Sequence, residues 1–314
     1  MRAIAVRALG ATPEMMDLPK PAAGPGEILV KLRAAGVNPL DWKIAEGAFQ
    51  PDRPHTFPLI LGVDGAGTVE SIGEGVTGFA VGDGVYGQFL HMPLGIGTYA
   101  EYVVAPETLG ISVSPRGMYD DQAAAVPTPG MTALTAIDAL ALSRGQSLLI
   151  MGASGGVGSF AVQLASNAGV TVLTAARGPH RDYLHKLGAS RFYDAKSATF
   201  LDDVRLGYPD GVDAVLDLAQ RGPEFERTIA LVKAGGIAAS TVGAATEAAV
   251  GARGLRAMNI NLAPRRELLD RLAKEYSAGR IRIPLDEKFP LAAAVDALAK
   301  HRTGQSRGKT VLTI

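Results

Sequence analysis

Cysteine is absent from the 314 residues of this sequence. Disulfide bonds, cysteine zinc sites and thiol nucleophiles are therefore excluded. A charge excess is also missing: 31 basic side chains balance 31 acidic ones, which argues against a general binder of nucleic acids or anionic membranes. No uninterrupted apolar run reaches membrane-spanning length, and the first residues resemble a strand rather than a signal peptide. We therefore expect no membrane partner and a cytoplasmic location.

The composition that remains, 47% hydrophobic and 20% charged, is typical of a globular protein, and the length allows two domains. Residues 1–122 are rich in Gly and Pro between short alternating runs, which predicts an irregular β-rich domain. From residue 123 strand and helix patterns alternate, which predicts an α/β fold with a doubly wound parallel sheet. The predicted strands are 147–151, 170–174, 191–193, 212–217 and 236–242, and the predicted helices are 132–142, 156–168, 180–187, 199–206 and 223–233.

The end of the sequence has a different pattern. Two amphipathic segments, 264–278 and 290–301, predict helices. Residues 309–314 alternate apolar and polar side chains and predict a final strand.

A glycine-rich turn joins an apolar strand pattern to a helical one. The turn reads Gly-Ala-Ser-Gly-Gly-Val-Gly over residues 152–158, and a second strand pattern follows at the distance that a βαβ unit requires. Such a turn lets the backbone approach a pyrophosphate, whose charge lies at the positive end of the helix. We therefore expect a dinucleotide at Ser154, Gly155, Gly156, Val157 and Gly158.

Several ordered motifs together resemble the medium-chain dehydrogenase/reductase superfamily, in its zinc-free branch of quinone oxidoreductases, zeta-crystallin-like proteins and alkenal/enone reductases. The resemblance implies a GroES-like catalytic domain built from residues 1–122 and 259–314, with a Rossmann domain, residues 123–258, inserted between them. It also implies an active site in the cleft and a homodimer. The motifs lie at 36–43, 61–69, 81–86, 97–102, 127–133, 153–158 and 307–312.

The resemblance also bears on metal binding. Zinc-dependent relatives have Cys where this sequence has Asn38, and a His-Glu pair where it has Val63 and Asp64. The five histidines are scattered and show no paired metal-ligand spacing. We therefore expect no metal.

The residues after the second Rossmann strand indicate which dinucleotide binds. An Asp or Glu that would bind the ribose of NAD is missing there, and Arg177 is placed to meet a 2′-phosphate instead. NADPH is therefore the expected cofactor. The resemblance adds Tyr193 near that phosphate; a partly buried core tyrosine is the alternative. Further cofactor contacts are expected at Thr132, Leu218, Ala219, Val242 and Gly243, by their places at strand ends and at a helix start.

The resemblance also suggests catalytic residues from one short segment. Asn38 could donate to a developing oxyanion or hold the nicotinamide ribose, and Lys43 could stabilise enolate charge or relay a proton while Asp41 orients it. The alternative is an Asp41–Lys43 ion pair with a structural role, because residues two apart in a strand point the same way.

An apolar substrate wall is expected from four side chains, with plain core packing as the alternative. They are Phe49, Phe89, Met92 and Leu94.

The predicted function is zinc-independent, NADPH-dependent hydride transfer to a small quinone or an α,β-unsaturated carbonyl compound such as an alkenal or enone. Two alternatives stay open. One is an enoyl-thioester reductase, and the other is a structural or regulatory protein that binds NADPH without turnover.

Overall fold

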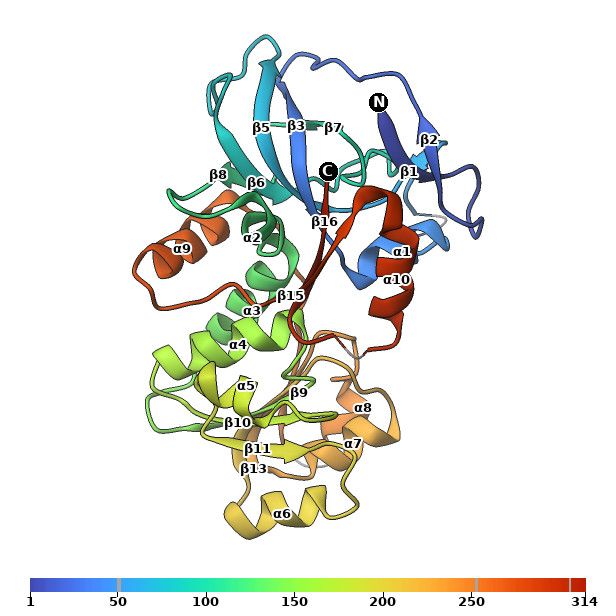
Figure 1. The fold of residues 1–314 in the computed structure, drawn as a ribbon. Coiled ribbons are helices and arrows are strands. Elements are labelled where there is room, and N and C mark those ends of the chain that lie inside the picture. Colours follow the sequence, from blue (N-terminus) through green and yellow to red (C-terminus); the bar gives the residue numbers. More distant parts are fainter. Residues whose placement is uncertain (50–51, 252–253, 305) are drawn as a thin grey trace. The chain divides into compact units, whose positions relative to one another are not determined.

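The computed structural model describes the chain at residues 1–49, 52–251, 254–304 and 306–314. Over these residues the chain divides into two compact units (Figure 1). Unit 1 contains Met1–Met131, Pro264–Ser277 and Leu285–Ile314, and unit 2 contains Thr132–Ala263 and Ala278–Pro284. Unit 1 thus extends past the predicted boundary at residue 122. In the described ranges, no helix combines the length and the apolar character needed to cross a bilayer.

Unit 1 is rich in β-structure. Its larger sheet has the order β15-β16-β3-β5-β6-β8, with β7 also paired to β3, and its smaller sheet has the order β2-β1-β4. Strand β16, from the end of the chain, lies beside β3 from its beginning (Figure 1). The strands are β1 (Arg2–Val6), β2 (Glu14–Asp17), β3 (Glu27–Gly36), β4 (Leu59–Ile60), β5 (Asp64–Ile72), β6 (Gly84–Gln88), β7 (Tyr102–Pro106), β8 (Ile111–Val113), β15 (Leu285–Pro290) and β16 (Lys309–Thr313).

Short helices flank these sheets. Trp42 and Leu40 of the first helix pack on a core formed by β1, β4 and the last helix, because their apolar surface is removed from water there. The helices are α1 (Pro39–Ala45), α2 (Asp120–Ala124), α9 (Arg266–Ser277), the 3-10 turn η2 (Leu291–Ala293) and α10 (Ala294–Arg302).

Unit 2 confirms the predicted doubly wound sheet. Its strands are all parallel to their neighbours, in the order β11-β10-β9-β12-β13-β14. The strands are β9 (Ser147–Met151), β10 (Thr171–Ala176), β11 (Arg191–Asp194), β12 (Val212–Asp217), β13 (Val232–Ser240) and β14 (Arg256–Asn259). The helices are α4 (Gly156–Asn167), α5 (Arg181–Lys186), α6 (Phe200–Gly207), α7 (Pro223–Ile229) and α8 (Glu247–Val250), and α3 (Pro127–Leu140) leads into the unit.

One local prediction is wrong in a way that matters for the site. Residues 39–45 form helix α1, whereas the argument about Asp41 and Lys43 assumed a strand. Residues two apart on a helix point in different directions. Asp41 is accordingly buried and Lys43 is exposed, so the two side chains do not share a face.

Candidate functional site

The glycine-rich turn has the geometry that a pyrophosphate requires. Gly152 has a positive φ of 75°, and Gly155 is the N-cap of α4 in an extended conformation with no side-chain cap. The first backbone amides of α4 are therefore not satisfied by a capping side chain. A Cβ on Gly158 would lie 2.6 Å from the backbone of Ala153, so only glycine allows this close packing of helix and turn.

The turn lies next to the loop that follows β12. A Cβ built on Gly152 would be 3.5 Å from the Cβ atoms of Leu218 and Ala219. The loop after β13 begins with Val242 and Gly243, at the same carboxyl edge of the sheet. The structure therefore brings these predicted cofactor residues together at the edge where parallel α/β sheets bind ligands.

Arg177 and Tyr193 lie in different surroundings. Arg177 follows the last residue of β10 and is exposed. The Tyr193 ring packs edge-on against Phe200, with 6.1 Å between centroids, and joins an apolar cluster. Its hydroxyl is buried, and burial raises its pKa against the attraction of Arg191. These contacts favour the core alternative for Tyr193.

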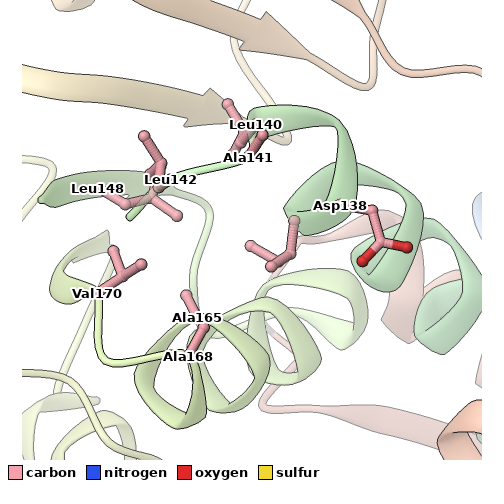
Figure 2. Close-up of a pocket in the computed structure, with 9 residues that line it drawn as sticks. Asp138, Leu140, Ala141, Leu142, Leu148, Ala165, Ala168 and Val170 are labelled. Atoms are coloured by element: carbon pink, nitrogen blue, oxygen red, sulfur yellow. The ribbon is translucent and has the colours of Figure 1, made fainter. Parts of the chain in front are cut away.

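An apolar pocket of about 260 Å³ lies elsewhere in unit 2. Its lining includes Leu148 and Val170, near the amino ends of β9 and β10, and Asp138 lies on one side of it (Figure 2). None of the predicted cofactor residues lines this pocket. The pocket is therefore separate from the candidate dinucleotide site.

Unit 1 contains a buried charge cluster, formed by Asp41, Asp64, Lys309 and the amide of Asn38. The Lys309 ammonium donates to Asn38 Oδ1 at 2.7 Å and to the carbonyl of Val37. Asn38 Nδ2 donates to Asp64 Oδ2 at 2.9 Å. The Asn38 amide therefore links the lysine to the carboxylate, and its side chain is only 2% exposed.

Further hydrogen bonds hold each carboxylate. Thr128 donates to Asp64 through its backbone amide, at 3.0 Å, and through its hydroxyl, at 2.7 Å. Asp41 Oδ2 accepts from the Asn38 backbone amide at 2.7 Å and from the Tyr99 hydroxyl at 2.8 Å. Asp41 Oδ1 is buried without a partner. Asp64 thus supports the start of α3, and Asp41 supports the start of α1.

Burial sets the electrostatics of this cluster. It raises the pKa of Asp41 to about 7, although hydrogen bonds from Asn38 and Tyr99 oppose the shift. It also raises the pKa of Asp64 against the attraction of Lys309, and it lowers the pKa of Lys309. Removal from water disfavours every charged form here, and the opposite charges only partly compensate.

These contacts limit what the predicted catalytic residues can do. The Asn38 amide is already bonded to Lys309 and Asp64, and it lies 3.4 Å from the carbonyl of Gly36. Lys43 is exposed. Asp41 bonds to Asn38 and Tyr99 and does not orient Lys43.

The predicted substrate wall separates into two groups. Phe89 is fully buried and Leu94 is 1% exposed, both within hydrophobic cores. Phe49 and Met92 are 38% and 43% exposed. Phe49 has a positive φ of 75°, and the Arg53 guanidinium lies 4.6 Å from its ring centroid. Phe49 and Met92 are therefore the members that remain accessible to a ligand.

The cluster positions do not fit a zinc ion. The lysine ammonium bonded to Asn38 would repel a cation, and both Asp64 oxygens already accept hydrogen bonds. Across the described ranges, no group of three His, Cys, Asp or Glu side chains is arranged to hold a metal.

Sequence reasoning missed Lys309, Thr128 and Tyr99. Lys309 lies inside the recognised motif at 307–312, but a lysine at the start of a strand gives no local sign of burial. A buried ion has to be paired, so two acidic residues in the matched motifs, Asp41 and Asp64, were the available signal for a basic partner.

Two family models match the chain. The alcohol dehydrogenase GroES-like domain matches residues 24–115, and the zinc-binding dehydrogenase model matches residues 187–312. A chloroplast envelope quinone oxidoreductase homolog of Arabidopsis thaliana is 33% identical, over 95% of this chain and 93% of its own length. A 2-methylene-furan-3-one reductase of Solanum lycopersicum is 32% identical, over 91% of this chain and 71% of its own length.

Solved structures resemble the whole chain. The quinone oxidoreductase of Coxiella burnetii superposes with a TM-score of 0.89 at 30% identity, covering 100% of this chain and 99% of its own. A mycobacterial protein solved with NADPH gives a TM-score of 0.87 at 27% identity, with both chains covered completely. A structure described as an NAD-dependent alcohol dehydrogenase gives 0.90 at 29% identity, again covering both chains.

Proposed function

The chain belongs to the medium-chain dehydrogenase/reductase superfamily, in its quinone oxidoreductase branch, and on that premise we propose an NADPH-dependent, zinc-independent reductase of quinones or α,β-unsaturated carbonyl compounds. The observation that carries the proposal is the uncapped start of α4 behind a glycine turn, with Arg177 at the end of the next strand. A glycine turn before a helix start receives the pyrophosphate of a nicotinamide dinucleotide, and an arginine after the second strand accommodates a 2′-phosphate.

Several residues of unit 2 would hold the cofactor. Gly155 and Gly158 would let the first amides of α4 approach the pyrophosphate, and Leu218 and Val242 start the loops beside it. Arg177 would pair with the 2′-phosphate, since a planar guanidinium matches phosphate oxygens. NADPH, when bound, supplies the hydride. We place Thr132 near the nicotinamide on the strength of the resemblance alone.

Zinc independence is proposed because the Lys309 ammonium, bonded to Asn38 in the buried charge cluster, would repel a metal ion. A protein group therefore has to stabilise the charge that zinc would otherwise stabilise. Reduction of an enone or quinone places negative charge on an oxygen, and a hydrogen-bond donor stabilises that charge. Lys43 is the candidate donor, because it is exposed on α1. Asn38 and Asp41 would act by fixing the start of α1, which is a positioning role.

Phe49 and Met92 are proposed as the apolar contacts of the acceptor. Both are exposed side chains of unit 1.

We retain as predictions a homodimer, from the resemblance, and a cytoplasmic location.

A second candidate is an enoyl-thioester reductase. A trans-enoyl reductase of Aspergillus terreus is 31% identical, over 93% of this chain and 87% of its own length. Enoyl thioesters are also electrophilic at the β-carbon, so the same hydride transfer would serve.

Consumption of NADPH, followed by its absorbance, tests the proposal with a simple quinone, an alkenal, a cyclic enone and an enoyl thioester as acceptors. We expect turnover with a quinone or enone. Binding of NADPH without consumption of any acceptor would instead support a non-catalytic role.

Lys43→Ala should lower turnover with enones, and unchanged turnover would remove Lys43 from the mechanism.

Arg177→Ala tests the cofactor. It should raise the Kd of NADPH by about tenfold or more, because a charge-assisted contact contributes roughly 1.5 to 3 kcal/mol, and should leave the Kd of NADH nearly unchanged. Arg205→Ala is the matched control, since Arg205 pairs with Asp202 on the exposed face of α6. Equal weakening of NADPH and NADH by Arg177→Ala would contradict the assignment.

A further inference from the structure

Three polar residues form a row across the carboxyl edge of the sheet in unit 2. Asp217 ends β12 and is the register partner of Ser240, which ends β13. Ser240 is in turn the partner of Asn259 at the end of β14. Neighbouring register positions in parallel strands point to the same face of a sheet. Asp217 and Ser240 are both fully buried.

Asp217 and Ser240 each bind the backbone of the loop that follows their own strand, and Asn259 binds the segment that follows β13. Asp217 Oδ1 accepts from the amide of Gln220 at 3.0 Å and lies 3.4 Å from the amide of Ala219. Ser240 Oγ accepts from the amides of Val242 at 3.1 Å and Ala244 at 3.2 Å. The Asn259 amide exchanges two hydrogen bonds with the backbone of Ala245.

Asp217 and Ser240 are also linked to each other. The Ser240 side chain hydrogen-bonds to the Asp217 carboxylate. Because the Ser240 oxygen accepts from backbone amides, its hydroxyl proton is the atom donated to Asp217. One side-chain pair therefore fixes two loops that come from adjacent strands.

The two loops are those on which the proposed cofactor site depends. Leu218 and Ala219 lie beside the glycine turn at Gly152, and Val242 and Gly243 start the loop after β13. The pair contacts loop backbone, so it is suited to set loop position.

We propose that Asp217 and Ser240 are positioning residues for the dinucleotide, holding the loops 218–220 and 242–244 in the conformation that receives it. This inference rests on the proposed function. A carboxylate is costly at a fully buried position: burial raises the pKa of Asp217 to about 6, against the donors from Gln220, Ala219 and Ser240 and the charge of Arg221. The protein keeps this costly carboxylate at the edge of the sheet where ligands bind, which fits a functional role for Asp217.

The test measures the Kd of NADPH by fluorescence titration, together with the Tm of the free protein. Ser240→Ala removes the hydroxyl that joins the loops, and Asp217→Asn removes the charge at constant shape. We expect each to raise the Kd about tenfold, since a hydrogen bond to a charged group contributes roughly 1.5 kcal/mol or more. KM for NADPH should rise in parallel with the Kd. The value of kcat at saturating NADPH should stay within about twofold, because the lost interaction stabilises the ground state and the transition state equally. Ser240→Thr keeps the hydroxyl and should restore binding.

Asp213→Asn is the matched control, because Asp213 lies on the same strand at its amino end. It should lower the Tm and leave the Kd of NADPH unchanged. The inference is overturned if Ser240→Ala binds NADPH as tightly as the wild type, or if Asp213→Asn weakens binding equally. Should Asp217→Asn fail to fold, Ser240→Ala and Ser240→Thr decide the question. A wild-type protein that binds neither NADPH nor NADH refutes the proposed function itself, which is a different result.

Discussion

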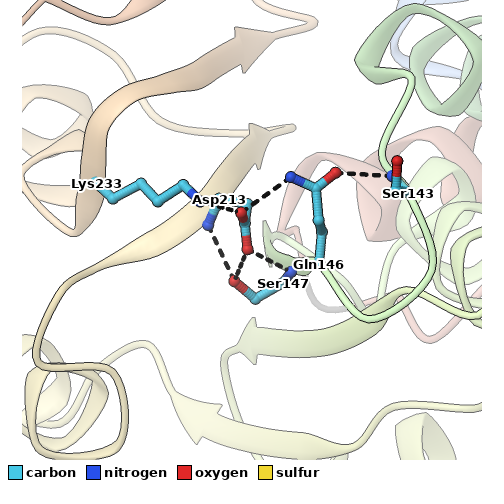
Figure 3. A network of polar contacts seen from close by, with 5 residues as sticks. All are labelled: Ser143, Gln146, Ser147, Asp213 and Lys233. Atoms are coloured by element: carbon cyan, nitrogen blue, oxygen red, sulfur yellow. Dashed lines mark hydrogen bonds and ion pairs between the residues drawn. The ribbon is translucent and has the colours of Figure 1, made fainter.

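Unit 1 and unit 2 each hold aspartates in a polar network, and the two networks have opposite electrostatics. In unit 2, Asp213 accepts from the Ser147 amide at 2.8 Å, the Ser147 hydroxyl at 2.7 Å and Gln146 at 3.0 Å, and pairs with Lys233 at 2.5 Å (Figure 3). Partial burial disfavours its charge, but these donors outweigh burial and hold its pKa well below the usual range. In unit 1, burial raises the pKa of Asp41 and Asp64.

The difference shows that the number of donors and the access of water decide the sign of the shift. The side chain of Asp213 is 15% exposed, and its donors come from several neighbouring groups. Asp41 and Asp64 are buried more completely; they also accept hydrogen bonds, but the single cation that attracts both is the Lys309 ammonium. The first network stabilises an ionised carboxylate, whereas the second tolerates one.

Removal of Lys309 should have the largest effect. Lys309→Met leaves two buried carboxylates without their cation, and we expect a loss of about 3 to 5 kcal/mol in the free energy of unfolding. Urea unfolding at pH 7.5 measures it. Lys288→Met is the control, because Lys288 pairs with Asp121 at the surface and should contribute no more than about 1 kcal/mol. The double variant Lys309→Met with Asp64→Asn should recover part of the loss, and no recovery would contradict the charge argument.

Neutralisation of Asp213 should have a smaller effect. Asp213→Asn removes the ion pair with Lys233 and one acceptor, and should cost roughly 2 kcal/mol at pH 7. Because the folded pKa lies below the unfolded value of about 3.9, this stabilisation is complete above about pH 5 and disappears as pH falls further. Wild type and variant should therefore converge in acid. Asp202→Asn, at an exposed pair on α6, should change little at any pH.

The pH dependence of Asp41 should be opposite in sign to that of Asp213. Its folded pKa of about 7 lies above the unfolded value of about 3.9, so the wild type should lose stability as pH rises from 5 to 8. Asp41→Asn cannot ionise and should lose roughly 2 to 3 kcal/mol less over that interval. Chemical denaturation at several pH values measures both slopes, and parallel curves would show that Asp41 does not titrate there.

The sequence predicted unit 2 better than unit 1. Strands β9 and β12 begin and end at the predicted residues, because apolar side chains dominate both and a glycine, Gly145 or Gly211, precedes each. Strand β14 was not predicted; its sequence, Arg-Ala-Met-Asn, is short and mostly exposed. The other edge strand, β11, was predicted at 191–193, so the miss is specific to β14.

Helix α1 could have been predicted, and the burial of Lys309 could not. Asn38, Pro39 and Asp41 occupy the N-cap, N1 and N3 positions of α1, which is a recognisable helix start. Lys309 is buried because β16 pairs with β3, and that pairing joins residues at opposite ends of the chain. Likewise Phe89 and Leu94 were predicted in a substrate wall, with core packing as the alternative, and they are buried; composition does not distinguish a loop that folds inward from one that lines a site.

The late position of β16 has a consequence for synthesis of the chain on the ribosome. Unit 2 draws on residues no later than Pro284, whereas unit 1 needs Lys309 to neutralise its aspartates and β16 to cover an edge of β3. During translation, unit 2 can therefore complete its sheet while unit 1 still waits for β16, which pairs with the end of β3 at residues 34–36. The part of the chain that emerges first is thus the last to become native.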